Sequence, residues 1–179
     1  MMRVFLAVFF VTGTLAPSDD PPGDINAKVL AFARSKMGEQ VGDGKCAALV
    51  RSAYQETGAK PRLPKEPGES FAWGDPVASV KEARPGDVVV FDKVSFRGRR
   101  RIIADDGSPR ISITTQMFPQ HVAIVAAVGP KGKTLTILHQ NVGQPDGSSE
   151  TFVQEARLVM SEMRKGGSMT IFRPIAPEP

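Results

Sequence analysis

Cys46 is the only cysteine in this chain of 179 residues, and it follows the glycine-rich stretch GDGK at residues 42–45. This pattern predicts a loop that leads into a helix beginning at the cysteine. A thiol in the first turn of a helix lies near the positive end of the helix dipole, which favours its thiolate form. Because no second cysteine is available for a disulfide, Cys46 is either a small buried apolar residue or a nucleophile.

The only two histidines, His121 and His139, lie in one predicted β-hairpin. An apolar strand over 121–128 begins at His121, a GPKG turn follows at 129–132, and the strand over 133–139 ends at His139. One strand begins where the other finishes, so both imidazoles lie at the same end of the hairpin. We expect them within reach of one hydrogen bond.

These three side chains are the parts that cysteine-based catalysis requires. A thiolate needs an imidazole that holds it as an ion pair, and a third polar group that fixes the imidazole tautomer. Cys46, His121 and His139 supply these types. A metal site is not expected, because one cysteine and two histidines give three ligands at most and no CxxC or HExxH pattern occurs. No cofactor is expected.

Two helices are predicted to precede the strands. Asp24 is a suitable cap for the first helix, and Gly38 ends its apolar period. The second helix is expected to begin at Cys46 and to stop at Gly58. A long ordered loop should follow over 59–85, because this segment contains five prolines and no sustained period.

The second half of the chain has the character of a β-sheet. Asp87 belongs to a Pro-Gly-Asp turn and is expected to serve that turn rather than catalysis. A polar excursion is expected over 92–110 and a helical turn over 158–164. The predicted strands cover residues 88–91, 111–113, 121–128, 133–139, 151–156 and 169–173. Helices followed by an antiparallel sheet indicate an α+β fold.

The N-terminus predicts export. Residues 1–16 combine a positive start, a short apolar run and small residues, which is the pattern of a signal peptide. We therefore expect a protein that is secreted, periplasmic or held in the cell envelope. The apolar run is too short to span a membrane, so no stable span should remain after signal removal. A Pro-rich linker (17–23), a domain (24–175) and a tail (176–179) are expected to follow.

The composition does not favour a nucleic-acid partner. The formal net charge is +4 and the sequence pI is about 9.4. Basic residues are not interleaved with aromatic residues in the way that single-strand binding requires. The RGRRR run at 97–101 is more typical of a solvated loop than of a docking site for an anionic polymer. We expect a monomer.

Three segments, in this order, resemble the CHAP and NlpC-type papain-like cysteine hydrolases. They are GDGKCAALV (42–50), ARPGDVVVF (83–91) and QHVAIVAAVGPKGKTLTILHQN (120–141). The resemblance implies a papain-like fold with N-terminal helices packed on an antiparallel sheet. A related cysteine proteinase-like module occurs in some fungal actin-patch adaptor proteins, and IFRP at 171–174 is similar to its end.

The resemblance also implies roles for individual residues. Cys46 would be the nucleophile, His121 the general base and acid, and His139 the orienting residue, where CHAP proteins commonly carry Glu. Asn141 matches an Asn of the CHAP pattern and is the rival for the orienting role. Gln140 is adequately explained as a surface residue.

The function that follows is a secreted cysteine amidase or endopeptidase that cleaves an amide bond in peptidoglycan, with cell-wall peptide as its substrate. The alternative is a non-catalytic module that binds a peptide or glycan on the same fold.

Overall fold

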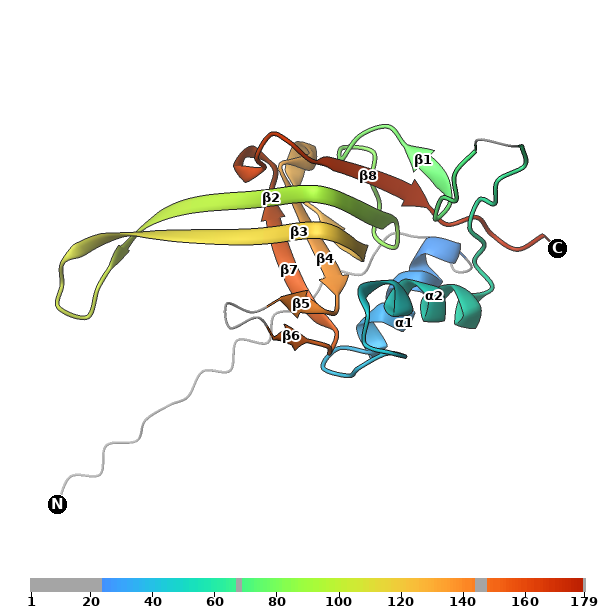
Figure 1. The fold of residues 1–179 in the computed structure, drawn as a ribbon, viewed down its shortest axis with the longest axis horizontal. Helices are drawn as coiled ribbons and strands as arrows, with labels where there is room; N and C mark the ends of the chain where they lie inside the picture. Colours follow the sequence, from blue (N-terminus) through green and yellow to red (C-terminus); the bar gives the residue numbers. More distant parts are fainter. Residues whose placement is uncertain (1–23, 67–68, 144–147, 179) are drawn as a thin grey trace, which may run out of the picture.

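The computed structural model describes residues 24–66, 69–143 and 148–178. The expected signal peptide (1–16) and linker (17–23) lie outside these residues. Two helices pack against one side of an antiparallel sheet (Figure 1). This is the α+β architecture that the order of predicted elements indicates.

Both helices begin where the sequence predicts. The side chain of Asp24 accepts a hydrogen bond of 3.1 Å from the backbone N–H of Asn26 and caps α1 (Ile25–Ser35). Helix α2 (Cys46–Thr57) begins at the cysteine and is followed by Gly58. Gly58 has a φ of 76°, a left-handed conformation that glycine adopts without strain.

The larger sheet contains six strands in the order β1-β8-β2-β3-β4-β7. Along the chain they are β1 (Asp75–Val77), β2 (Val88–Ile103), β3 (Pro109–Val128), β4 (Thr134–His139), β7 (Gln154–Val159) and β8 (Ser168–Arg173). Two short strands pair with each other, β5 (Val142–Gly143) and β6 (Ser149–Glu150). Two single-turn 3-10 helices are η1 (Pro130–Gly132) and η2 (Met160–Glu162).

The polar excursion expected over 92–110 is wrong. Strand β2 continues to Ile103, and β3 returns from Pro109 as its antiparallel partner. The two form a long hairpin arm that projects beyond the rest of the sheet (Figure 1). The arginines of this arm conceal the strand pattern in the sequence, because they follow and outnumber the buried alternating residues Val94 and Phe96. The strand expected at 151–156 is also displaced, since β7 covers Gln154–Val159.

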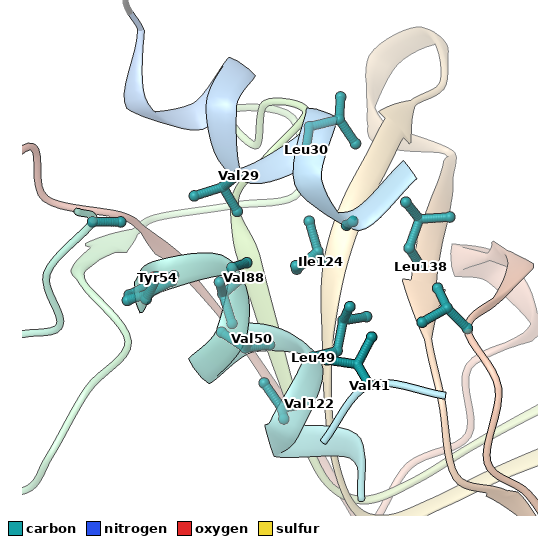
Figure 2. Packing of buried hydrophobic residues seen from close by; sticks show 14 of the residues in the cluster. Val29, Leu30, Val41, Leu49, Val50, Tyr54, Val88, Val122, Ile124 and Leu138 are labelled. Atoms are coloured by element: carbon teal, nitrogen blue, oxygen red, sulfur yellow. The ribbon is translucent and has the colours of Figure 1, made fainter. Parts of the chain in front are cut away.

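Hydrophobic side chains fill both faces of the sheet. On the helix side, Val122 and Ile124 of β3 pack with Val29 and Leu49 of the two helices (Figure 2). Neighbouring residues of a strand point to opposite faces. Accordingly, Ala123 and other alternating strand residues belong to a second buried cluster. The sheet therefore presents different surroundings to successive residues of β3 and β4.

Asp87 has a larger role than the turn that the sequence suggests. Its carboxylate is fully buried and accepts hydrogen bonds from Asn26 of α1 (2.7 Å) and from the backbone N–H of Arg84 (2.8 Å). Arg173 of β8 donates to it from Nε (3.1 Å) and Nη2 (3.0 Å). This carboxylate ties the first helix, the turn before β2 and the closing strand together.

Removing this carboxylate should destabilise the fold strongly. Asp87→Ala leaves Arg173 and two N–H groups without their acceptor, so we expect the free energy of unfolding to fall by about 3 to 5 kcal/mol. Urea denaturation measures this change. The matched control is Asp75→Ala, which removes an exposed ion pair with Arg62 (3.2 Å) and should change stability by less than about 1 kcal/mol. Equal effects of the two substitutions would contradict this role of Asp87.

Candidate active site

The two histidines contact each other directly. His121 lies on β3 opposite Phe91 of β2, and His139 is the last residue of β4. The distance between His121 Nε2 and His139 Nδ1 is 3.0 Å, which is a hydrogen bond. Both residues are nearly inaccessible, with exposed fractions of 9% and 3%. The hairpin thus brings the rings together in the way that its two-strand pattern anticipates.

An aromatic wall surrounds the pair. The ring of Phe118 lies 5.4 Å from that of His121 and 6.0 Å from that of His139, and it stacks on Phe91 at 4.6 Å. Burial lowers the pKa of His121 to about 4. Burial and, next, the proximity of His121 lower the pKa of His139 to about 3. Both imidazoles are therefore neutral at neutral pH, and one donates the shared proton to the other.

Gln140 follows the pair and is fully buried, so its expected surface position is wrong. Its Nε2 donates to the carbonyl oxygens of Val41 (2.9 Å) and Lys45 (2.8 Å). Its Oε1 accepts from the N–H of Val41 (3.1 Å). The side chain of Gln140 therefore holds both ends of the glycine-rich loop that precedes Cys46.

Cys46 is the first residue of α2 and is partly buried against the cluster on the helix side. Gln140 binds the carbonyl of Lys45, which belongs to the peptide group that leads into Cys46. The sequence neighbours His139 and Gln140 thus connect the histidine pair with the cysteine loop. Within the residues that the structure describes, no hydrogen bond joins the Cys46 sulfur to either imidazole. The two histidines are hydrogen-bonded to each other, and Cys46 is not hydrogen-bonded to either of them in the described residues.

Asn141 lies directly after Gln140 in a left-handed conformation with a φ of 63°. Its side chain has no hydrogen bond to His121 within the described part of the chain, where His139 occupies Nε2 of that ring. Asn141 instead lines the mouth of a pocket. The geometry therefore puts His139, and not Asn141, in contact with His121, while the role of each residue stays a prediction.

The pocket has a volume of about 930 Å³ and opens where β3 diverges from β4 and β7. Both histidines lie on its wall, together with residues 115–120, 141–143 and 154–157. Residues 24–66, 69–143 and 148–178 contain no group of three or more His, Cys, Asp or Glu side chains able to hold a metal ion. None of the helices in those ranges has the length and apolar character needed to cross a membrane.

This arrangement defines which nitrogen is available for chemistry. Nε2 of His121 is hydrogen-bonded to His139, so Nδ1 is the nitrogen of His121 that can exchange a proton with a thiol or a substrate. A bond at one ring nitrogen fixes the tautomer and the orientation of the other. Sequence reasoning missed Gln140, although its place between His139 and Asn141 at a strand end was a signal. A residue next to a site residue on a strand faces the other side, where here the cysteine loop lies.

The burial of the two histidines predicts that the folded state loses stability as the pH falls. Their folded-state pKa values lie below the value near 6.5 of an unfolded chain, so the unfolded state takes up protons first as pH falls. Stability should be complete above pH 6.5 and should decrease by about 2 kcal/mol per histidine between pH 7 and pH 5. Urea denaturation at several pH values measures this slope.

The control uses the fact that the chain has no other histidine. In His139→Asn one of the two titrating groups is gone, and the loss of stability between pH 7 and pH 5 should be roughly halved. An unchanged slope in His139→Asn would contradict the assignment of the acid sensitivity to this pair.

The hydrogen bonds of Gln140 predict that its substitution will destabilise the loop before Cys46. Gln140→Leu preserves most of the side-chain volume but removes three hydrogen bonds, so we expect a loss of about 2 to 4 kcal/mol in the free energy of unfolding. Amide hydrogen exchange should also accelerate at residues 41–46 more than in β2. Gln154→Leu is the control, because among the described residues that amide donates to Glu150 (2.9 Å) and makes no hydrogen bond to the loop before Cys46. If hydrogen exchange at residues 41–46 were equal in Gln140→Leu and wild type, Gln140 would not hold this loop.

Comparison with known proteins agrees with this architecture. The model of the AIM3/BBC1 cysteine proteinase-fold domain matches residues 23–178. The chain matches no curated protein and no solved structure. The match supports the papain-like, cysteine proteinase-like fold that the sequence motifs imply, and it does not support membership of the CHAP or NlpC families in particular. The chain belongs to the AIM3/BBC1 cysteine proteinase-fold family.

Proposed function

We propose that this domain is a cysteine-type hydrolase that cleaves an amide bond of a polypeptide. Cys46 is the nucleophile, His121 the general base and acid, and His139 the residue that orients His121. The observation that carries the proposal is the 3.0 Å contact between His121 Nε2 and His139 Nδ1. It supplies the orienting half of a catalytic triad and leaves Nδ1 of His121 for the thiol.

The proposed reaction follows from these roles. The Cys46 sulfur gives its proton to His121 Nδ1 and attacks the carbonyl carbon of the peptide. The backbone N–H of Cys46 is one donor to the developing oxyanion. His121 returns the proton to the leaving amine as the C–N bond breaks, which leaves a thioester on Cys46. Water then loses a proton to His121, attacks the thioester, and releases the carboxylic acid and the free thiol.

The active arrangement requires a closer approach of Cys46 and His121 than the resting structure has. Catalytic hydrogen bonds are often long in unliganded enzymes and shorten when the substrate binds. The approach has to pass the end of β4, because His139 and Gln140 point to opposite faces of that strand and the cysteine loop lies on the Gln140 side. A peptide that enters the pocket beside the histidines would supply the remaining contacts.

We propose a polypeptide substrate rather than peptidoglycan. The peptidoglycan expectation came from the CHAP resemblance, whereas the family to which the chain belongs is that of the AIM3/BBC1 domain. An amide of a polypeptide is the bond that the cysteine proteinase fold in the family description suggests. Export remains a prediction from residues 1–16 alone.

A second function, peptide binding without turnover, has one observation in its favour. The two imidazoles form a hydrogen bond with each other, and burial keeps the pKa of His121 at about 4 and that of His139 at about 3. Neutral imidazoles of such low basicity are weak partners for a thiolate. In a binding module the pair would be a structural element of the pocket wall, and Cys46 would be a helix residue with no chemical role.

Peptide cleavage decides between these functions. Full-length protein is incubated with a library of unstructured peptides, and new termini are identified by mass spectrometry. We expect cleavage that Cys46→Ala abolishes and that His121→Ala reduces by roughly a hundredfold or more. Gln55→Ala, a substitution of an exposed α2 residue that does not line the pocket, controls for folding. Absence of cleavage by the native protein, or equal cleavage by Cys46→Ala, would leave the binding module as the function.

A further inference from the structure

The arm formed by β2 and β3 carries the charge of the whole chain. Residues 93–120 contain six cationic side chains and two anionic ones, so their formal charge is +4. The entire chain also has a formal net charge of +4, and the remaining residues are therefore balanced. One of the anionic groups, Asp106, is already paired with Arg110 at 2.8 Å. The arm is thus a concentrated cationic feature on an otherwise neutral molecule.

The strand register places three of the arginines on one face. Arg97, Arg99 and Arg101 alternate along β2, so their side chains point in the same direction. Arg100 lies between the last two and points to the opposite face. All four arginines are exposed. We call the row of Arg97, Arg99 and Arg101 the arginine row.

A row of aliphatic side chains runs beside the arginine row on the same face. Ile111 pairs with Arg101 and Ile113 pairs with Arg99 across the two strands. The exposed fractions of Ile111 and Ile113 are 55% and 50%, and that of Met117, farther along β3, is 70%. Exposed aliphatic side chains at this density on a rigid strand pair mark an interaction surface rather than a solvated one.

The outer edge of β3 is open beside these rows. Strand β3 pairs with β2 from Pro109 to Ile124, whereas β4 joins β3 only from Ile124 onward. In the part of the chain that the structure describes, the edge of residues 109–121 therefore has no strand partner. Unpaired backbone N–H and C=O groups on a strand edge are a template for an added strand. Pro109 and Pro119 bound the available stretch.

The open edge leads to the histidine pair. Residues 115–121 of β3 line the pocket that also contains His121 and His139. A chain that pairs with the edge of β3 would run along the arm and enter this pocket. The arm and the pocket are therefore one continuous surface.

We propose that the β3 edge binds an extended polypeptide segment in which acidic and aliphatic residues are mixed. The segment adds as a strand to β3 and presents its acidic and aliphatic residues on the face that carries both rows. Its aliphatic side chains pack on Ile111, Ile113 and Met117, and its acidic side chains reach across β3 to the arginine row on β2. It enters the pocket beside His121. This inference deepens the proposed function, on which it rests for the fate of the bound segment, by naming the chemistry of the substrate.

Other anionic partners fit this surface less well. A nucleic acid would find no aromatic side chain on the arginine-row face on which to stack its bases, since residues 97–117 contain none. An anionic membrane would meet Asp105 and Asp106 at the tip of the arm, which is the part that would approach the bilayer first. A strand partner uses the backbone edge as well as both side-chain rows.

The test measures binding in the full-length Cys46→Ala protein, in which turnover is absent. The probe is a fluorescein-labelled nine-residue peptide that repeats Glu-Ser-Val-Ser, which places Glu and Val on one face of an added strand long enough to pair with residues 110–118, and anisotropy reports its binding. Two further probes are the same peptide with Lys in place of Glu and the acidic peptide N-methylated at alternate amides. We expect binding of the unmodified acidic peptide only, because charge and strand pairing are both required.

Variants of the protein locate the surface. Replacing the arginine row with Arg97→Glu, Arg99→Glu and Arg101→Glu should weaken binding by roughly tenfold or more, whereas Arg100→Glu on the opposite face should change it less than about twofold. Circular dichroism verifies that each variant folds. Equal weakening by both variants, or undiminished binding of the N-methylated peptide, would overturn the inference. So would binding of phosphatidylserine vesicles without binding of the acidic peptide.

The outcomes separate this inference from the proposed function. Cleavage of library peptides by the native protein, together with no binding of the acidic probe, would refute the acidic segment and leave the hydrolase intact. Binding of the probe without any cleavage would support the inference and refute the hydrolase.

Discussion

The buried amide of Gln140 is the interaction on which the candidate site depends. Its three hydrogen bonds hold the loop before Cys46 against the residue that follows β4. The preceding residue, His139, faces the other way and binds His121. Two consecutive side chains at the end of β4 therefore connect the N-terminus of α2, on one face of the sheet, to His121 of the neighbouring strand β3, whose ring lies on the other face. The packing of α2 adds to this connection, because Cys46 contacts the cluster that contains Val122 and Leu138, the sequence neighbours of the two histidines.

Burial of the histidine pair fixes the orientation of the rings but lowers their basicity. Burial against Phe118 fixes both rings and their shared proton, but it also lowers their pKa values well below neutrality. A fixed neutral imidazole is well oriented and poorly basic. In the proposed mechanism the thiolate of Cys46 supplies the missing charge when it approaches His121, since an adjacent negative charge raises the pKa of an imidazole. The same burial explains why acid should destabilise the fold.

Local signals in the sequence sufficed for the helices and the hairpin. Asp24 and Gly58 mark helix ends through capping and left-handed backbone conformation, and the apolar run that begins at His121 indicates a strand. The arm was missed because the alternation of Val94 and Phe96 with polar residues is short and is followed by four arginines, which together read as a polar loop. Gln140 was missed for a different reason. Its place next to His139 at a strand end is a local signal, but its burial depends on a distant loop that the local pattern does not identify.

The central claim is that His121 acts on Cys46, and the rate at which the thiol is alkylated tests it most directly. Iodoacetamide modification of folded protein is followed from pH 5 to pH 9 in wild type and in His121→Ala. The account predicts appreciable modification of wild type at neutral pH and a rate at least roughly tenfold lower in His121→Ala, because the imidazole stabilises the thiolate. Equal rates in the two proteins, or modification only after unfolding in urea, would contradict it.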